Sequence, residues 1–301
     1  MLSDPRLRRL KETILAGVEW FWIIGFTLAG RWHRRRGVCS VNHWTASTSP
    51  RHILVVAPHP DDEAIGCAGA IIKHKQEGDA VWIAYITDGR QSRALGLAAL
   101  EMAQRRRQEA QAAAGILGVD GLEWFGLAEG AWSAAELKPR LQTLLERFQP
   151  DIIYAPSRID FHPEHHQIAY LLAQLLPERP TPLVRIYQIH LPLTPVLTNV
   201  VVDTSRMLVL TRAALEAHAS QFYSVAKTRR MRRYAAHFYG LSQQAEEFWE
   251  LPAARYRQLH QSPPGQWSGQ AFWGIRFHPF SDPLAYLKGL AERRRLAKLV
   301  N

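Results

Sequence analysis

Two short segments of the sequence concentrate side chains that bind metal ions. They are HPDDE at residues 59–63 and DFHPEHH at residues 160–166. Three acidic residues in so short a turn repel one another unless a cation neutralises them. Zinc accepts both imidazole nitrogens and carboxylate oxygens. Because His59 and Asp62 are three residues apart, one tight turn can direct both side chains at the same ion.

The residues beside this pair suggest the rest of a catalytic centre. Asp61 has to point away from Asp62, so it can stand next to the metal as a general base. His162 and His165 are three apart at the start of an expected helix and therefore lie close together. His165 can complete a His–Asp–His set that leaves a fourth coordination position open for water, as catalytic zinc sites do.

Other histidines and acids near these segments have less direct interpretations. Asp160 is a candidate to orient one of the ligand histidines, and His166 is expected on the helix surface or behind the ligands. Alone, either segment is more often a capped helix start or a solvated face. The remaining histidines are interpreted as structural or solvated; those considered are His52, His74, His190, His237 and His260.

The surrounding pattern places both segments at one edge of a sheet. Apolar runs predict strands at 53–57, 80–87, 122–125 and 151–155, and helices are predicted at 64–76, 97–117, 133–148 and from 163 to about 176. Strands alternating with helices of this length form a parallel sheet, whose ligands bind at the carboxyl ends of the strands. Further on, residues 183–190 and 199–205 look β-like, and helices are expected at 212–221 and 230–249.

The motifs, taken in order, resemble the PIG-L/LmbE family of zinc-dependent N-acetylglucosaminyl deacetylases. The resemblance rests on PHPDDE at 58–63, TDG at 87–89, RxxE at 106–109, HPEH at 162–165 and HxSQ at 218–221. It implies a Rossmann-like three-layer α/β/α fold with a mostly parallel sheet. It also implies one zinc ion per chain, held by His59, Asp62 and His165.

The same resemblance implies roles for the residues around the ion. Asp61 corresponds to the general base, and His162 to the group that stabilises the oxyanion or protonates the leaving amine. Arg90 and Arg93, which follow the TDG motif, are the expected substrate contacts. The chain departs from the family pattern in having Glu164 where Asp is usual, and Thr211 where Lys is frequent.

The expected reaction is zinc-dependent hydrolysis of the acetamide of an N-acetylglucosaminyl conjugate, releasing acetate and a free amino sugar. One alternative is a zinc amidohydrolase acting on a non-sugar N-acyl conjugate. An alternative of another class is a non-catalytic glycan-binding module, although such a module would tolerate the loss of His59, Asp61 or His162. The expected partner is a small-molecule or lipid-linked substrate of the N-acetylglucosamine type.

The N-terminal region differs in composition from the rest. Residues 13–30 are apolar except for Glu19, and their uninterrupted run is too short for a bilayer span of about 20 residues. Three consecutive aromatic residues, at 20–22, and basic flanks favour a helix lying on a membrane surface. The alternative is a helix packed on the protein core or on a second subunit.

We therefore divide the chain into four parts. They are a basic, apolar segment at 1–36, a linker at 37–50, the PIG-L/LmbE-like domain at 51–250, and a C-terminal covering segment or tail at 251–301. The net charge is +10, and residues 1–36 contribute +5 of it. No nucleic-acid-binding motif accompanies this charge, so we expect no nucleic-acid partner. Two cysteines, Cys39 and Cys67, favour a reducing compartment, hence the cytoplasm and, for the N-terminal segment, the inner face of the membrane.

Overall fold

The computed structural model describes residues 5–36, 42–44, 48–160, 162–178, 180–190, 192–263 and 290–300. Within these ranges the strands form one sheet of eight, in the order β1-β7-β8-β6-β5-β2-β3-β4. Adjacent strands are parallel, except that β8 runs antiparallel to β6 and β7. The strands are β1 Asn42–His43, β2 His52–Ala57, β3 Ala80–Thr87, β4 Gly121–Leu127, β5 Ile152–Ala155, β6 Leu183–Tyr187, β7 Val200–Asp203 and β8 Ala245–Pro252.

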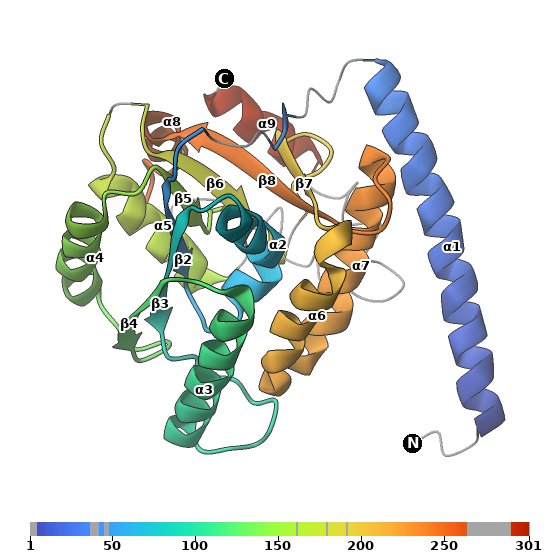
Figure 1. The fold of residues 1–301 in the computed structure, drawn as a ribbon, viewed down its shortest axis with the longest axis horizontal. Coiled ribbons are helices and arrows are strands. Elements are labelled where there is room, and N and C mark those ends of the chain that lie inside the picture. The colour runs from blue at the N-terminus through green and yellow to red at the C-terminus, as the bar shows by residue number, and fades with distance from the viewer. Residues whose placement is uncertain are drawn as a thin grey trace.

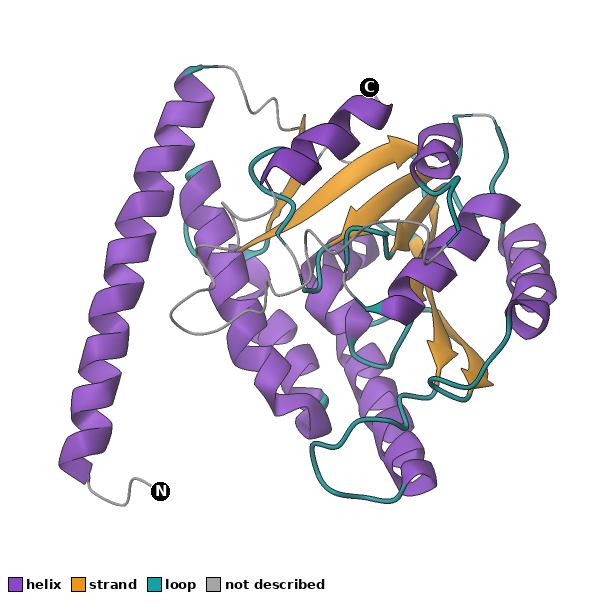
Figure 2. Cartoon of the chain, turned by 180° about the vertical axis from the view of Figure 1, so that it is seen from behind, coloured by secondary structure: helices purple, strands orange, loops and turns teal. Residues whose placement is uncertain are grey.

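Helices cover both faces of this sheet, as Figures 1 and 2 show from opposite sides. Against one face pack α4 (Ala134–Phe148), α5 (Pro163–Leu175), α8 (Ala253–Leu259) and α9 (Leu290–Val300). Against the other pack α2 (Asp62–Gln76), α3 (Ala99–Leu117) and α6 (Leu208–Ala217). The expected three-layer α/β/α fold with a mostly parallel sheet is confirmed.

The order of the strands explains where a ligand site can form. Strand β2 lies between β3 and β5, so the chain first builds the sheet outward through β3 and β4, then returns to add β5 and β6. This reversal separates the loops that follow β2 and β5, and opens a crevice at their carboxyl ends. The strands here are continuous apolar runs, as strands buried on both faces must be.

One helix predicted from the sequence is wrong in its second half. Helix α7 (Phe222–Tyr239) ends at Gly240, and the expected helical residues 245–249 belong to β8. The strand AEEFWELP was not predicted because its charged residues suggested a solvated helix. Its first two acids, however, have hydrogen-bond partners inside the protein. Glu246 accepts hydrogen bonds from the backbone N–H groups of Gly69 and Ala70, and Glu247 accepts one from the hydroxyl of Thr194.

The structure also differs from two of the segment boundaries that we drew from the sequence, those of the linker and of the C-terminal segment. Residues 42–43 pair with β7 as β1, so the segment at 37–50 is not a linker throughout; 37–41 and 45–47 lie outside the described residues. The limit expected at residue 250 falls inside β8, because this strand continues to Pro252. Beyond it, α8 and α9 bury apolar side chains against the core and form a covering layer.

The N-terminal segment forms a single helix, α1 (Pro5–Arg35), which lies along one side of the molecule beside α7 (Figure 1). Ile23 and Phe26 are buried against α7, where Phe26 stacks on Tyr234 at a ring separation of 4.9 Å. Glu19 forms an ion pair with Arg233 at 2.9 Å. The expected packing on the protein's own core is therefore correct for this face. None of the described helices is long and apolar enough to cross a bilayer.

Candidate active site

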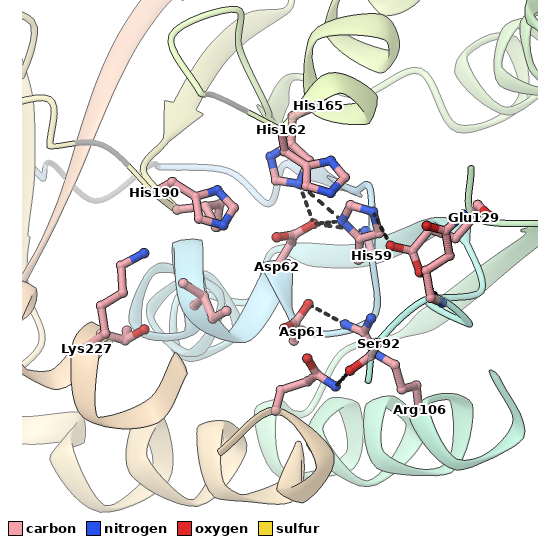
Figure 3. A pocket seen from close by; sticks show the side chains of 15 residues that line it. His59, Asp61, Asp62, Ser92, Arg106, Glu129, His162, His165, His190 and Lys227 are labelled. Atoms are coloured by element: carbon pink, nitrogen blue, oxygen red, sulfur yellow. Dashed lines mark hydrogen bonds and ion pairs between the residues drawn. The ribbon is translucent and has the colours of Figure 1, made fainter. Parts of the chain in front are cut away.

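A polar cavity of about 220 Å³ opens at the carboxyl ends of β2 and β5. The two segments predicted from the sequence to bind metal both reach it, one from the start of α2 and the other from the start of α5 (Figure 3). The expectation that they meet at this edge is fulfilled. The side chains that line the cavity are those of His59, Asp61, Asp62, Ile65, Gln91, Ser92, Arg106, Glu129, His162, His165, Ile189, His190, Gln221, Lys227 and Thr228.

Three donor atoms form a nearly equilateral triangle at the centre of this cavity. His59 Nδ1 lies 3.2 Å from His165 Nε2, and Asp62 Oδ2 lies 3.4 Å from the first of these nitrogens and 3.3 Å from the second. All three side chains are almost completely buried. Atoms this close, two of them imidazole nitrogens and one a carboxylate oxygen, can share a single metal ion.

His162 offers a competing arrangement, since one of its nitrogens lies within 4.8 Å of ligand atoms of His59 and His165. Its hydrogen bonding argues for a different task. The backbone N–H of Glu164 donates to His162 Nδ1 at 3.3 Å, and burial, with the neighbouring His165 and His59, lowers the pKa of His162 to about 3. A neutral ring whose Nδ1 accepts carries its proton on Nε2, so His162 can donate into the cavity.

Each of the two triangle histidines is held from behind by a carboxylate. Glu164 Oε2 lies 2.7 Å from His59 Nε2, and Asp160 Oδ2 lies 3.0 Å from His165 Nδ1. A carboxylate that binds one ring nitrogen fixes the proton there and turns the other nitrogen toward the metal position. The orienting role expected of Asp160 thus has a matching geometry, and Glu164 supplies a second case that the sequence did not reveal.

Glu164 also fastens a loop to the site. Its second oxygen, Oε1, accepts hydrogen bonds from the backbone N–H of Gly130 at 2.8 Å and from the indole of Trp132 at 2.7 Å. These residues follow β4, and Glu129 of the same loop lines the cavity. The longer side chain at the position where the family usually has Asp therefore connects the loop after β4 to His59.

Asp61 is held in an unusual backbone conformation, with φ 148° and ψ −21°, which glycine adopts far more readily. Arg106 fixes its side chain by donating to Oδ1 at 2.8 Å, and to the carbonyl of Pro60 at 2.7 Å. Burial raises the pKa of Asp61 to about 6, although Arg106 opposes this effect. The strained turn separates Asp61 from Asp62, so that the two neighbouring carboxylates face different parts of the cavity (Figure 3).

The charges at the triangle are those of a cation site. Burial lowers the pKa of His59, but hydrogen bonds to Asp62 and Glu164 outweigh it and raise the pKa to about 9. Asp62 and Asp160 likewise raise the pKa of His165 against burial. The surrounding carboxylates therefore favour positive charge at this point.

The two arginines expected to contact substrate do not line the cavity. Arg90 turns back to Asp88, and its Nε donates to that carboxylate at 2.7 Å. Arg93 is exposed and also absent from the lining. Gln91 and Ser92 of the same loop are the residues that reach the cavity. The structure therefore does not bring the two arginines to the cavity: the first pairs with an adjacent acid and the second faces solvent.

Comparison with known proteins agrees with this geometry. Residues 54–176 match the profile of the PIG-L family, described as GlcNAc-PI de-N-acetylase. This stretch of the chain is similar to a PIG-L domain. The matched range contains all three corners of the donor triangle, together with Asp61 and His162.

Proteins similar to this chain include enzymes of two reaction types. Diacetylchitobiose deacetylase of Thermococcus kodakarensis is 28% identical over 76% of this chain and 84% of its own length. 4-Oxalmesaconate hydratase of Pseudomonas putida is 29% identical, over 42% of this chain and 52% of its own. N,N'-diacetylchitobiose deacetylase of Pyrococcus horikoshii has a similar fold, with a TM-score of 0.58 at 24% identity, covering 68% of this chain and 85% of that one.

Two further motifs noted in the sequence meet beside the cavity. Glu109 accepts hydrogen bonds from the backbone N–H and the hydroxyl of Ser220, at 3.0 and 2.6 Å. His218 Nε2 lies 2.8 Å from Glu63 Oε1, and Glu63 in turn accepts from the backbone N–H of Asp61. The RxxE and HxSQ motifs thus hold each other and support the turn that carries Asp61.

Sequence reasoning missed several residues that line the cavity, three of them with ionisable side chains. His190, interpreted from the sequence as structural or solvated, has its Nδ1 2.7 Å from Asp160 Oδ1 and borders the cavity. Glu129 and Lys227 enter from the loop after β4 and from α7. No motif surrounds any of them. The only available signal for His190 was its position at the carboxyl end of the β-like segment predicted at 183–190.

Proposed function

We propose that this chain is a zinc-dependent deacetylase that hydrolyses the acetamide of an N-acetylglucosaminyl conjugate to acetate and a free amino sugar. The chain is an amide-hydrolysing enzyme by its likeness to named deacetylases. The observation that carries the finer proposal is the triangle of His59 Nδ1, Asp62 Oδ2 and His165 Nε2, with Asp61 and His162 beside it.

The size of the triangle supports zinc as the ion. Four ligands at about 2.0–2.1 Å around a tetrahedral ion lie roughly 3.3–3.4 Å from one another. The three measured separations, 3.2, 3.3 and 3.4 Å, agree with such an ion. We assign His59, Asp62 and His165 as the ligands, one ion per chain. When bound, zinc polarises a carbonyl group and makes water in the site more acidic.

The chain's own residues supply the proton transfers. Asp61, with a pKa near 6, accepts a proton from the water that attacks the acetamide carbon. His162 donates its Nε2 proton toward the carbonyl oxygen as negative charge develops there. The amine leaves once Asp61 or His162 has protonated its nitrogen. Arg106 holds the Asp61 carboxylate in place throughout.

We propose a small-molecule or lipid-linked conjugate of N-acetylglucosamine as the substrate. The diacetylchitobiose deacetylases support the sugar, and the polar lining of the cavity suits a hydroxyl-rich ligand. We further propose a cytoplasmic location, at the inner face of the membrane, with peripheral association through residues 13–30. The hydratase relative makes addition of water to a double bond the reaction that has to be excluded.

The test is a substrate panel with zinc-loaded protein. We would incubate it with N-acetylglucosamine, diacetylchitobiose, lipid and nucleotide conjugates of the same sugar, an N-acetyl amino acid and an unsaturated dicarboxylic acid, with Asp61→Asn as control. Acetate and free amine in equal amounts from a sugar conjugate are expected. Turnover of only the amino acid would favour the non-sugar alternative. Turnover of only the unsaturated acid would contradict the proposal, as would binding of a glycan without any hydrolysis.

A further inference from the structure

Helix α1 exposes a stripe of large apolar side chains on the face that points away from α7. Trp20, Ile24 and Leu28 recur every four residues, Phe21 widens the stripe, and Trp32 continues it by four more residues. Their exposed fractions are 62, 53, 59, 70 and 49%, respectively. A soluble surface scatters such residues singly, whereas a contiguous apolar patch marks an interaction site.

The helix is fixed in place by its other face, so the exposure is not a sign of a loosely attached segment. Gly30 lets the backbone of α1 approach the carbonyl of Phe238 too closely for any larger side chain. Arg34 donates to the same carbonyl. Together with buried Ile23 and Phe26, these contacts orient the stripe outward as a rigid surface.

We propose that this stripe binds the surface of an anionic lipid bilayer, with the helix axis lying in the membrane plane. Arg31, Arg35 and Arg36 are all exposed at the end of the stripe, and the guanidinium of Arg36 lies 4.4 Å from the ring centre of Trp32. Aromatic rings flanked by arginines suit the boundary between lipid tails and negatively charged headgroups. The inference deepens the proposed peripheral association and rests on it.

A second copy of the chain is a less suitable partner for this stripe, because both helices would carry an excess of positive charge. Residues 5–36 contain eight basic residues and only two acidic ones. Within residues 17–36, where side chains are described, the one acid is Glu19, which is already paired with Arg233 on the inner face. Two α1 stripes packed together, in either direction, would bring together helix ends that carry far more basic than acidic residues. A bilayer containing anionic lipid offers the complementary charge.

The experiment compares vesicle binding by the full chain and by surface variants. Because Ile23 and Phe26 belong to the core, the helix is kept and only its outer face is changed, in the combined variant Trp20→Ser, Phe21→Ser, Ile24→Ser and Leu28→Ser. The matched control is Leu100→Ser with Val209→Ser, two side chains that are 71 and 79% exposed elsewhere. Sedimentation with vesicles of phosphatidylcholine, alone or mixed with phosphatidylglycerol, gives the partition coefficient.

We expect the wild-type chain and the control pair to bind the mixed vesicles, and the four-residue variant to lose at least about tenfold in partitioning. Arg31→Gln with Arg35→Gln should weaken binding to the mixed vesicles alone. Equal binding by the wild type and the four-residue variant overturns the proposal. So does a dimer that forms without lipid and that the same variant dissociates. The readout is independent of catalysis, so a failed deacetylase assay leaves this result intact.

Discussion

Proteins usually bury apolar side chains and expose charged ones, and two regions of this molecule depart from that rule in opposite ways. They are the active-site cavity and the outer face of α1. The cavity buries charged groups: Asp61, Asp62, Glu164 and His165 are all less than 9% exposed. Helix α1 leaves aromatic side chains in water. Both arrangements cost free energy in an isolated protein, because buried charges lose hydration and exposed apolar groups order water.

What separates the two regions is how far the fold itself compensates. In the cavity each buried carboxylate has named partners within hydrogen-bonding distance, and the remaining negative charge calls for a cation. On α1 the exposed stripe has no such internal compensation. The comparison agrees with our two proposals: a metal ion balances the charge of the cavity, and a lipid bilayer covers the apolar stripe of α1. The following changes test each half.

The largest effect is expected from removing a corner of the triangle. Asp62→Ala should abolish both bound metal and hydrolysis, because two imidazoles alone hold zinc weakly and lose their shared carboxylate. Chelation of the wild-type enzyme should have the same effect, reversed by added zinc. Metal analysis alongside the activity assay checks this. Full turnover by protein free of metal would refute the assignment.

Asp61→Asn should separate catalysis from metal binding. The amide keeps the shape and the contact to Arg106 but cannot accept a proton, so turnover should fall by about 10²–10⁴-fold with one zinc retained. Metal content and single-turnover rates measure the two quantities independently. Loss of the metal in this variant would mean that Asp61 is a ligand.

Glu164→Gln should weaken the metal rather than the chemistry. A neutral amide orients His59 less strongly, and loss of such a partner typically reduces metal affinity by about 10–100-fold. Competition with a chelator measures the dissociation constant. Glu164→Asp provides the comparison, since it restores the charge usual in the family with a shorter reach. Unchanged affinity in Glu164→Gln would reduce its role to holding the loop after β4.

Two adjacent isoleucines distinguish the faces of α1. Ile23 is 4% exposed and Ile24 is 53% exposed. Ile23→Ala should lower the free energy of unfolding by about 2 kcal/mol or more, since it leaves a cavity against α7. Ile24→Ala should change it by less than about 0.5 kcal/mol, as at most surface positions. Urea unfolding of both variants measures this, and equal effects would contradict the packing of the helix.

Glu247 is a buried acid outside the cavity, and its effect on stability should depend on pH. Burial raises its pKa from an ordinary 4.5 to about 7, so the folded protein holds a proton that the unfolded chain releases. This stabilisation is present below pH 4.5 and is lost as pH rises through 7. Across that window Glu247→Gln should gain up to about 3 kcal/mol relative to the wild type. Urea unfolding of both proteins at acid, neutral and mildly alkaline pH measures this. A difference in the free energy of unfolding that does not change with pH would contradict the prediction.

The sequence allowed the residues of the donor triangle to be placed together, but not the residues that line the rest of the cavity. The proximity of His59, Asp62 and His165 could be predicted because each lies in a compact motif that follows a strand, and the carboxyl ends of parallel strands meet. His190, Glu129 and Lys227 could not, since each comes from a different loop or helix and only the folded chain brings it to the cavity. The position of the Arg90 side chain could not be predicted either, because sequence spacing does not reveal that it pairs with Asp88.

The fold shows a similar division. Strands β2, β3 and β5 are uninterrupted apolar runs, so their positions could be predicted closely. Strand β8 was missed because Glu246 and Glu247 made it look solvated, whereas both acids are buried and bonded to groups distant in sequence. Helix α1 could be predicted as a helix, but which of its faces packs depends on α7, more than 200 residues away along the chain.

The backbone of Asp61 has a consequence for how the protein can diverge. A residue other than glycine at φ 148° carries a conformational cost of the order of 1–3 kcal/mol. Selection for folding alone would remove that cost, so we expect the acid to persist only where it serves as the general base proposed above. A descendant that merely bound sugars would be free to place glycine there and keep the metal ligands. The identity of this one residue would then distinguish working enzymes from lectin-like descendants with the same fold.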